Sequence, residues 1–263
     1  MKRSRFFRLT AAPAALLIFI FLIVALAQDR RSLAPRSWPS PAEQALFDAA
    51  NRERANRGIP ALRWDDALAS AAQAHAAWMA KESTISHQLS GEPALQQRTS
   101  QTGAHFSRVA ENVAEGPDAD TMHYNWMHSE GHRANILDLQ LTAIGIAVVS
   151  RGKQLYAVQD FSRRVKSLTA AEQEKRVGAL LSARGLQIAN ENEEARRVCA
   201  TNYNPSASGS MLIARYTTSE IGKLPDDLEK SIHQGRYNKA SVGACEPGGD
   251  NGFTQYRIAV LLH

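Results

Sequence analysis

Cysteine is scarce in this chain of 263 residues, which contains two, Cys199 and Cys245, both late in the sequence. Neither belongs to a C-x-x-C motif, so the pattern gives no support for thiol redox catalysis. In an oxidising compartment an even pair of cysteines predicts a disulfide. That bond would close a loop of about 46 residues and would stabilise the fold by roughly 4 kcal/mol. The alternative is two buried free thiols.

An excess of charge of one sign is also lacking once the N-terminus is set aside. The formal net charge is +5, but Lys2, Arg3, Arg5 and Arg8 supply four positive charges and the first 27 residues contain no acid, so residues 28–263 carry +1. A nearly neutral chain gives no reason to expect nucleic-acid binding. Hydrophobic residues at 44% and charged residues at 22% are ordinary for a globular protein and argue against disorder.

The N-terminal segment has the pattern of a secretory signal peptide. After the basic start comes an apolar core, ALLIFIFLIVALA, which ends in the small residues of Ala-Leu-Ala. We expect residues 1–27 to be removed and residues 28–39 to be a linker. An uncleaved membrane anchor is the alternative, because the uncharged run is near the lower length limit for a spanning helix. Either way, we expect residues 28 onward to be exported, as a secreted or periplasmic protein.

The segment after the linker has the pattern of an α+β domain. Ser40 and Glu43 form a capping box, so a helix is expected to begin there. A second helix near residue 65 has one apolar stripe that includes His75. Residues 83–110 have little apolar periodicity and are predicted to be mostly loop or short helix, and residues 119–128 to be helical. The runs AIGIAVVS and QLYAVQDFS, separated by Arg-Gly-Lys, predict a β-hairpin.

Residues 166–263 are expected to form a second, smaller α+β unit. Thr169 and Glu172 form another capping box. The runs SMLIARYTT, ASVGAC and FTQYRIAVLL are strand candidates, LPDDLEKSIHQG is a short helix, and residues 247–252 are a Gly-rich turn. The last strand would place four apolar side chains on one face: Tyr256, Ile258, Val260 and Leu262. No internal repeat is detectable along the chain.

Histidine, in contrast, is concentrated, because six of the eight histidines fall between residues 75 and 132. Imidazole suits Zn²⁺, Cu²⁺ and Ni²⁺, and a carboxylate usually orients each ligand histidine. His128 and His132 are four residues apart, with Glu130 between them. A metalloprotease helix has the pattern H-E-x-x-H, so the glutamate is one position late, and Gly131 disfavours a continuous helix. We therefore do not expect a metalloprotease helix.

Several motifs, taken in order, resemble a known family. They are LFDAANRERANRGIPALRWDDALASAAQAHAAWMA, SHQLSG, AENVAEG, WMHSEGHRANILDLQLTAIGIAV and YAVQDFS. Together they resemble the CAP superfamily, the cysteine-rich secretory, antigen 5 and pathogenesis-related protein (SCP-like) domain, in its bacterial branch. The resemblance implies a three-layer α-β-α sandwich for residues 40–163. Residues 166–263 lie outside it and would be the small α+β C-terminal unit.

The resemblance also implies a central cavity lined by two histidines and two glutamates. Matched by motif, His87 in SHQLSG and His132 in GHRANIL are the histidines, and Glu111 in AENVA is the first glutamate. The position of the second glutamate holds Ser129 in this chain, and Glu130, one place further along, is the candidate for that role. We expect this cluster to be a metal site for a divalent cation such as Zn²⁺.

Neighbouring residues are expected to have structural roles. His75 would be a core histidine that donates to a backbone carbonyl. Asn112 would satisfy backbone groups at a bend, and Trp126 would belong to the core. His128 would be exposed and outside the site, and Gly131 would lie at a turn into the site.

The resemblance implies an extracellular scaffold and no settled reaction. We expect a secreted, non-enzymatic binding module whose ligand is a lipid, another small apolar molecule or a cell-envelope component. It would contact a membrane only if the N-terminal segment stays uncleaved. The alternative is a metal-dependent hydrolase acting on envelope peptides or polysaccharide, although no Ser-His-Asp or Cys-His nucleophile pattern is present. A third reading is a structural envelope domain with a vestigial cavity.

Overall fold

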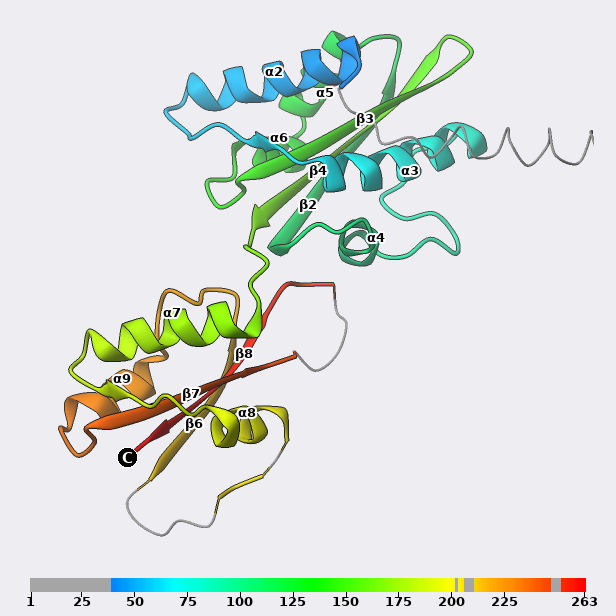
Figure 1. Ribbon diagram of the computed structural model, residues 1–263. Coiled ribbons are helices and arrows are strands. Elements are labelled where there is room, and N and C mark those ends of the chain that lie inside the picture. The colour runs from blue at the N-terminus through cyan, green and yellow to red at the C-terminus, as the bar shows by residue number, and fades with distance from the viewer. Residues whose placement is uncertain (1–38, 202, 206–210, 247–251) are drawn as a thin grey trace, which may run out of the picture. The chain divides into compact units, whose positions relative to one another are not determined.

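The computed structural model describes residues 39–201, 203–205, 211–246 and 252–263. The predicted signal peptide, nearly all of the predicted linker and most of the predicted Gly-rich turn lie outside these residues. Two four-stranded sheets are present in the described part of the chain. Each sheet has helices on both faces (Figure 1). Within the described residues, no helix combines the length and apolar character needed to cross a membrane.

The first sandwich, residues 39–164, is built on a sheet with the strand order β1-β3-β4-β2. The strands are β1 (Arg63–Trp64), β2 (Phe106–Gly116), β3 (Ala143–Arg151) and β4 (Gln154–Arg164). Strand β1 runs parallel to β3, and the other neighbouring strands are antiparallel. The predicted hairpin is confirmed as β3 and β4, which turn at Gly152 with a φ of 63° that favours glycine.

Helices cover both faces of this sheet and complete the predicted three layers. The helices are α2 (Pro41–Ala55), α3 (Asp66–Glu82), α4 (Leu95–Gln101), α5 (Ala119–His128) and α6 (Glu130–Leu137). Helices α2, α5 and α6 bury Leu46, Trp126 and Ile136 with one face of the sheet. Helix α3 buries Ala72 and Met79 against the other face. Both predicted helix starts are confirmed, with Ser40 and Glu43 in a capping box and Asp65 as the second cap.

Two local predictions in this sandwich are wrong. Strand β2 begins at Phe106, inside a segment predicted to be loop or short helix. The start of β2 lies at the sheet edge and is rich in polar residues, so it lacks the apolar pattern of a strand. Its pairing with β4 makes it a strand nevertheless. Gly131 lies in the first turn of α6 and not at a turn into the site. The break occurs at Ser129, whose ψ of 125° ends α5, so His128 and His132 belong to different helices.

The second sandwich, residues 169–262, has a sheet with the strand order β5-β7-β8-β6. The strands are β5 (Gln187–Ile188), β6 (Leu212–Thr218), β7 (Lys239–Cys245) and β8 (Tyr256–Leu262). Strand β5 runs parallel to β7, and the other neighbouring strands are antiparallel. The four apolar side chains of β8 share one core cluster, as predicted.

Three helices cover the second sheet: α7 (Ala170–Ser182), α8 (Glu193–Ala200) and α9 (Asp226–His233). Helices α7 and α9 pack on one face and α8 on the other. The capping box of Thr169 and Glu172 is confirmed at the start of α7. Helix α8 was not predicted, because its sequence is mostly charged and buries only Ala195, Val198 and Cys199.

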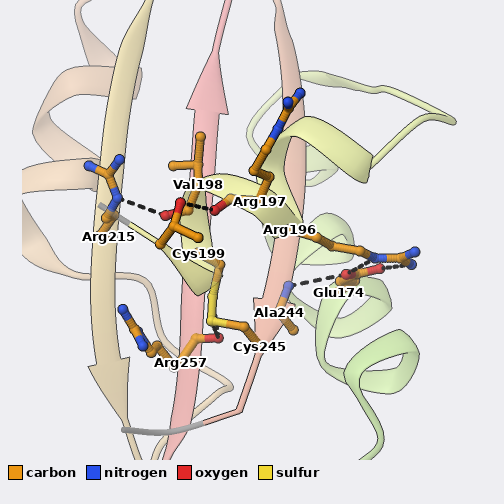
Figure 2. The surroundings of a disulfide bond; sticks show 10 residues. Glu174, Arg196, Arg197, Val198, Cys199, Arg215, Ala244, Cys245 and Arg257 are labelled. Atoms are coloured by element: carbon orange, nitrogen blue, oxygen red, sulfur yellow. Dashed lines mark hydrogen bonds and ion pairs between the residues drawn. A yellow bond between two sulfur atoms is a disulfide. The ribbon is translucent and has the colours of Figure 1, made fainter. Parts of the chain in front are cut away.

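The predicted disulfide between Cys199 and Cys245 is confirmed, with the two Cα atoms 5.8 Å apart. It joins α8 to the end of β7 (Figure 2). In Figure 2, Arg196 of α8 also meets Glu174 of α7 through a hydrogen bond from Nε to Oε1 of 2.7 Å. Helix α8 is therefore tied both to the sheet and to the helix layer on the opposite face.

Candidate functional site

The predicted site residues His87 and Glu111 are in direct contact. His87 lies in the loop after α3, and its Nδ1 is 2.8 Å from Oε1 of Glu111 on β2. Arg98 of α4 donates from Nη2 to the other carboxylate oxygen, and from Nη1 to the backbone carbonyl of His87 at 3.2 Å. The Glu111 side chain is 2% exposed and the His87 side chain is 63% exposed. Glu111 therefore holds the imidazole from its buried side and leaves the Nε2 edge facing outward.

The second predicted histidine lies next to the first. The ring centroids of His87 and His132 are 6.4 Å apart, with an interplanar angle of 43°. Two amides tie the helix that carries His132 to β2. Asn112 donates to the His132 carbonyl at 3.1 Å, and Asn135 donates to the Glu111 carbonyl at 3.1 Å and to Oδ1 of Asn112 at 2.9 Å. Asn112 thus satisfies a backbone group, as predicted, but from within a strand and not at a bend.

The two imidazoles differ in their affinity for a proton. The hydrogen bond with Glu111 raises the pKa of His87, against opposing effects of burial and of Arg98. Burial lowers the pKa of His132, and the neighbouring His87 lowers it further. As the pH falls, His132 therefore keeps its neutral form, which can bind a metal ion, to a lower pH than His87 does.

The candidate fourth residue, Glu130, is not brought to the two histidines. It lies exposed at the first position of α6. Among the described residues, no ion pair within 4.0 Å and no hydrogen bond joins Glu130 to His87 or His132. His128 is exposed as predicted, and its ring stacks on Tyr124 with the centroids 3.8 Å apart. The site that the structure assembles therefore consists of two histidines, Glu111 and Arg98.

His75 is confirmed as a core histidine beneath this site. Its Nδ1 is 2.7 Å from Oε1 of Glu92, and its Nε2 is 2.8 Å from the Ser86 carbonyl. Because a carbonyl can only accept, Nε2 of His75 carries a hydrogen. The second oxygen of Glu92 accepts from the backbone N–H of Leu89 at 3.0 Å. The buried pair of His75 and Glu92 therefore fixes the loop on both sides of His87.

Comparison with known proteins places this region in a family. Residues 47–161 match the model of CAP, the cysteine-rich secretory protein family. This segment is a CAP domain. The uncharacterized membrane protein YlbC of Bacillus subtilis is 29% identical over 126 residues, which are 46% of this chain and 34% of that protein. The uncharacterized protein YkwD of the same species is 30% identical over 111 residues, 42% of this chain and 43% of that protein. The chain therefore matches less than half the length of either relative.

Two solved structures of bacterial proteins are similar to the CAP domain. An extracellular protein containing an SCP domain from Bacillus anthracis is 29% identical, with a TM-score of 0.44, and the match covers 49% of this chain and 45% of that chain. A cysteine-rich secretory protein from Staphylococcus aureus is 21% identical, with a TM-score of 0.40, and the match covers 49% of this chain and 41% of that one.

Two residues of the CAP domain were missed from the sequence, Arg98 and Asp160. Asp160 lies on β4 directly opposite Glu111. It is fully buried, and within the described residues neither of its carboxyl oxygens has a hydrogen-bond partner. Burial, and then the Glu111 carboxylate, raise the pKa of Asp160 well above its ordinary value. The acidic residue between apolar neighbours in VQDF could have indicated Asp160 from the sequence. Arg98 lies in a polar segment, and no feature of that segment indicates its role.

Within the described residues, no group of three or more His, Cys, Asp or Glu side chains is arranged to hold a metal ion.

Proposed function

We propose that this chain carries an exported CAP-domain binding module in which His87 and His132 hold a divalent cation such as Zn²⁺. The observation that carries the proposal is the hydrogen bond from Nδ1 of His87 to Glu111, at 2.8 Å. Histidine ligands of metal ions almost always make such a bond through the ring nitrogen that does not bind the metal. The geometry therefore supports Glu111 as the residue that orients His87, and not as a ligand.

The residues at the site fit a loosely held cation. Both oxygens of Glu111 are engaged, one by His87 and one by Arg98, so the donor set is two imidazoles, which suit Zn²⁺, Cu²⁺ and Ni²⁺. Two protein ligands leave other coordination positions for water or for a polar group of a ligand. A bound cation would supply a positive charge to which such a group could attach. The ligand that we propose is a lipid-like or other small apolar molecule, or a cell-envelope component.

Hydrolysis is not part of the proposal. A metal-dependent hydrolase needs a general base in reach of the bound substrate. Among the described residues, the carboxylate that contacts His87 is Glu111, and Arg98 neutralises it. Glu130 is exposed and apart from the two histidines.

Export is proposed from the basic start, the apolar run and the Ala-Leu-Ala site of residues 1–27. Sequencing of the exported protein should begin at or near Gln28.

A thermal-shift series on the exported protein tests the cation site. Zn²⁺, Mg²⁺, Ca²⁺ and EDTA are compared, because an ion that binds only the native state adds about 2.7 kcal/mol of stability at a hundredfold excess over its Kd. His87→Ala and His132→Ala should each abolish the Zn²⁺-induced shift. Glu111→Gln should weaken Zn²⁺ binding by roughly 10 to 100-fold, as loss of an orienting carboxylate typically does.

His128→Ala is the matched control, because His128 is exposed and stacked on Tyr124, and it should keep the full shift. Glu130→Gln should also keep it. Loss of the shift in His128→Ala with retention in His87→Ala would contradict the assignment of ligands. The absence of a shift with every ion would favour the reading of a structural domain with a vestigial cavity.

A further inference from the structure

The two sandwiches have the same topology. The sheet orders β1-β3-β4-β2 and β5-β7-β8-β6 place the strands in the same sequence order across each sheet. In each, a two-residue strand at one edge runs parallel to its neighbour, and the other pairs are antiparallel. In each, the first helix precedes the short strand, and the next helix packs on the opposite face of the sheet. The sequence has no detectable internal repeat, so the correspondence lies in the structure.

Two glycines fix the register between the sandwiches. A Cβ on Gly145 of β3 would lie 2.0 Å from the backbone N of Ala69 and 2.3 Å from the carbonyl carbon of Leu68. A Cβ on Gly243 of β7 would lie 2.1 Å from the carbonyl carbon of Ala195 and 2.2 Å from the N of Arg196. In both sandwiches a helix backbone crosses the equivalent strand at a glycine, because only glycine allows that approach.

In each sandwich a carboxylate of the first helix also bonds the strand that carries the glycine, but at a different place along it: Val148 is three residues after Gly145, and Ala244 is one residue after Gly243. Oε1 of Glu43 in α2 accepts from the backbone N–H of Val148 in β3 at 3.0 Å. Oε1 of Glu174 in α7 accepts from the backbone N–H of Ala244 in β7 at 3.1 Å, as Figure 2 shows. In each case the glutamate bonds the strand that follows the short parallel strand in the sheet order.

We infer that the second sandwich is a diverged copy of the CAP fold in which an arginine replaces the site glutamate, so that the described residues form one site of this kind and not two. In the first sandwich, Gly145 pairs with Asp160, which pairs with Glu111. In the second, Gly243 pairs with Ala259, which pairs with Arg215. Arg215 therefore occupies the place of Glu111, and Ala259 that of Asp160.

Arg215 does in the second sandwich what Glu111 does in the first, with the opposite charge. Its Nε donates to the Val198 carbonyl at 2.9 Å (Figure 2), and its Nη2 donates to the Tyr203 carbonyl and to Oδ1 of Asn204. It thereby holds the chain that leaves α8, as Glu111 holds the loop that leaves α3. A guanidinium that is bonded to carbonyl oxygens cannot orient an imidazole for a cation. The equivalent position is therefore a structural anchor.

The same register explains the position of the disulfide. When Gly145 is aligned with Gly243, Cys245 corresponds to Ala147. When the helix residues that cross these glycines, Leu68 and Ala195, are aligned, Cys199 corresponds to Ala72. Ala72 and Ala147 are fully buried in one cluster, where α3 packs on β3. The second sandwich therefore has a covalent bond where the first has contact between two alanines. The sandwich with the smaller helix α8 thus gains a link between helix and sheet.

Transfer of the disulfide tests the correspondence in the full chain. Ala72→Cys with Ala147→Cys should form a second disulfide during export, seen as a new linked peptide pair on non-reducing digestion and mass mapping. Ala76→Cys with Ala147→Cys is the control. Ala76 is equally buried but lies about 6 Å further along α3 than Ala72, so this pair is expected to exceed the Cα separation of a disulfide and to stay unlinked. A folded Ala72/Ala147 variant with both new thiols free would overturn the proposal.

Glycine variants provide the second test if the cysteine pair does not fold. Gly145→Ala and Gly243→Ala should each lower the unfolding midpoint by about 5 °C or more, whereas Gly131→Ala, with nothing within 4 Å of the added Cβ, should not lower it. Tolerance of Gly243→Ala would overturn the shared register.

The claim of a single site rests on the proposed function and has its own readout. Titration of the full chain should give one Zn²⁺ equivalent, unchanged in Arg215→Ala. Two equivalents, or loss of Zn²⁺ in Arg215→Ala, would overturn it. No Zn²⁺ binding at all would instead refute the cation site, while the disulfide transfer still decides whether the sandwiches correspond.

Discussion

Arg54 offers the most demanding test of how the CAP domain is held together. Its side chain lies within the protein, with the residue 1% exposed. It donates four hydrogen bonds to backbone carbonyls: to Pro60 at 2.8 Å, to Ile136 and Asp138 at 2.9 Å, and to Leu141 at 3.1 Å. One guanidinium therefore joins α2 to the end of α6, the helix that carries His132, and to the segment that leads into β3.

We predict that Arg54→Met lowers the free energy of unfolding by about 3 to 5 kcal/mol. Methionine keeps much of the apolar volume but leaves four carbonyls without this donor, and each buried unsatisfied acceptor costs about 1 to 3 kcal/mol. The full sum is not expected, because burial of the guanidinium has its own cost: burial lowers the pKa of Arg54, although Asp138 partly offsets it. The range is that found when one partner of a buried charged network is removed, about 3 to 5 kcal/mol.

The assay is urea unfolding followed by tryptophan fluorescence. The four tryptophans all precede residue 127, so the signal reports on the first sandwich and not on the second. Arg57→Met is the matched control, because Arg57 lies in the turn directly after α2 but is 44% exposed in its side chain, with Glu53 as partner. Exposed pairs of this kind contribute about 0.3 to 0.5 kcal/mol. If the two variants differed by less than about 1 kcal/mol, the role assigned to the buried hydrogen bonds would be wrong.

Three further predictions concern protonation. In an NMR titration of the metal-free protein, His87 should show a midpoint above about 6.5 and His132 one below it, because Glu111 raises one pKa and burial lowers the other; equal midpoints would contradict the geometry. The stability from the His87–Glu111 pair should be complete below about pH 6.5 and should be lost as pH rises through the raised His87 pKa. Asp160→Asn should raise the thermal midpoint more at pH 8 than at pH 4. The pKa of Asp160 is raised in the folded protein, so the folded protein loses stability as the pH rises above about 3.9 toward that raised pKa. A variant that is less stable than the native protein at pH 8 would show that Asp160 is buried as a carboxylate.

Features fixed by neighbouring residues could be predicted from the sequence. The capping boxes at Ser40 and Thr169 depend on residues three positions away, and the hairpin of β3 and β4 on one short turn. Among the site residues, His87, Glu111 and His132 were found by family resemblance, and the structure brings them together. The disulfide followed from counting cysteines in an exported chain.

The rest depended on partners far along the chain. The start of β2 is a strand because it pairs with β4. Arg98 belongs to the site because it donates a hydrogen bond to Glu111. Glu130 is one position past the family pattern and follows the helix break at Ser129, and it lies exposed at the start of α6. The correspondence between the sandwiches could not be predicted from the sequence, because it rests on two glycines and on strand pairing, and neither produces a repeated sequence motif.

The hydrogen bonds that Glu43 and Glu174 accept from backbone N–H groups affect how each sheet could pair with another molecule. The short strands β1 and β5 cover only two residues of their neighbours, so each sheet has an edge where another chain could add a strand. A row of open backbone N–H groups is a template for such association. In each sheet a buried carboxylate already accepts from one of these N–H groups, at 3.0 Å and 3.1 Å. Each glutamate therefore removes one N–H group from those with which a strand of another molecule could pair.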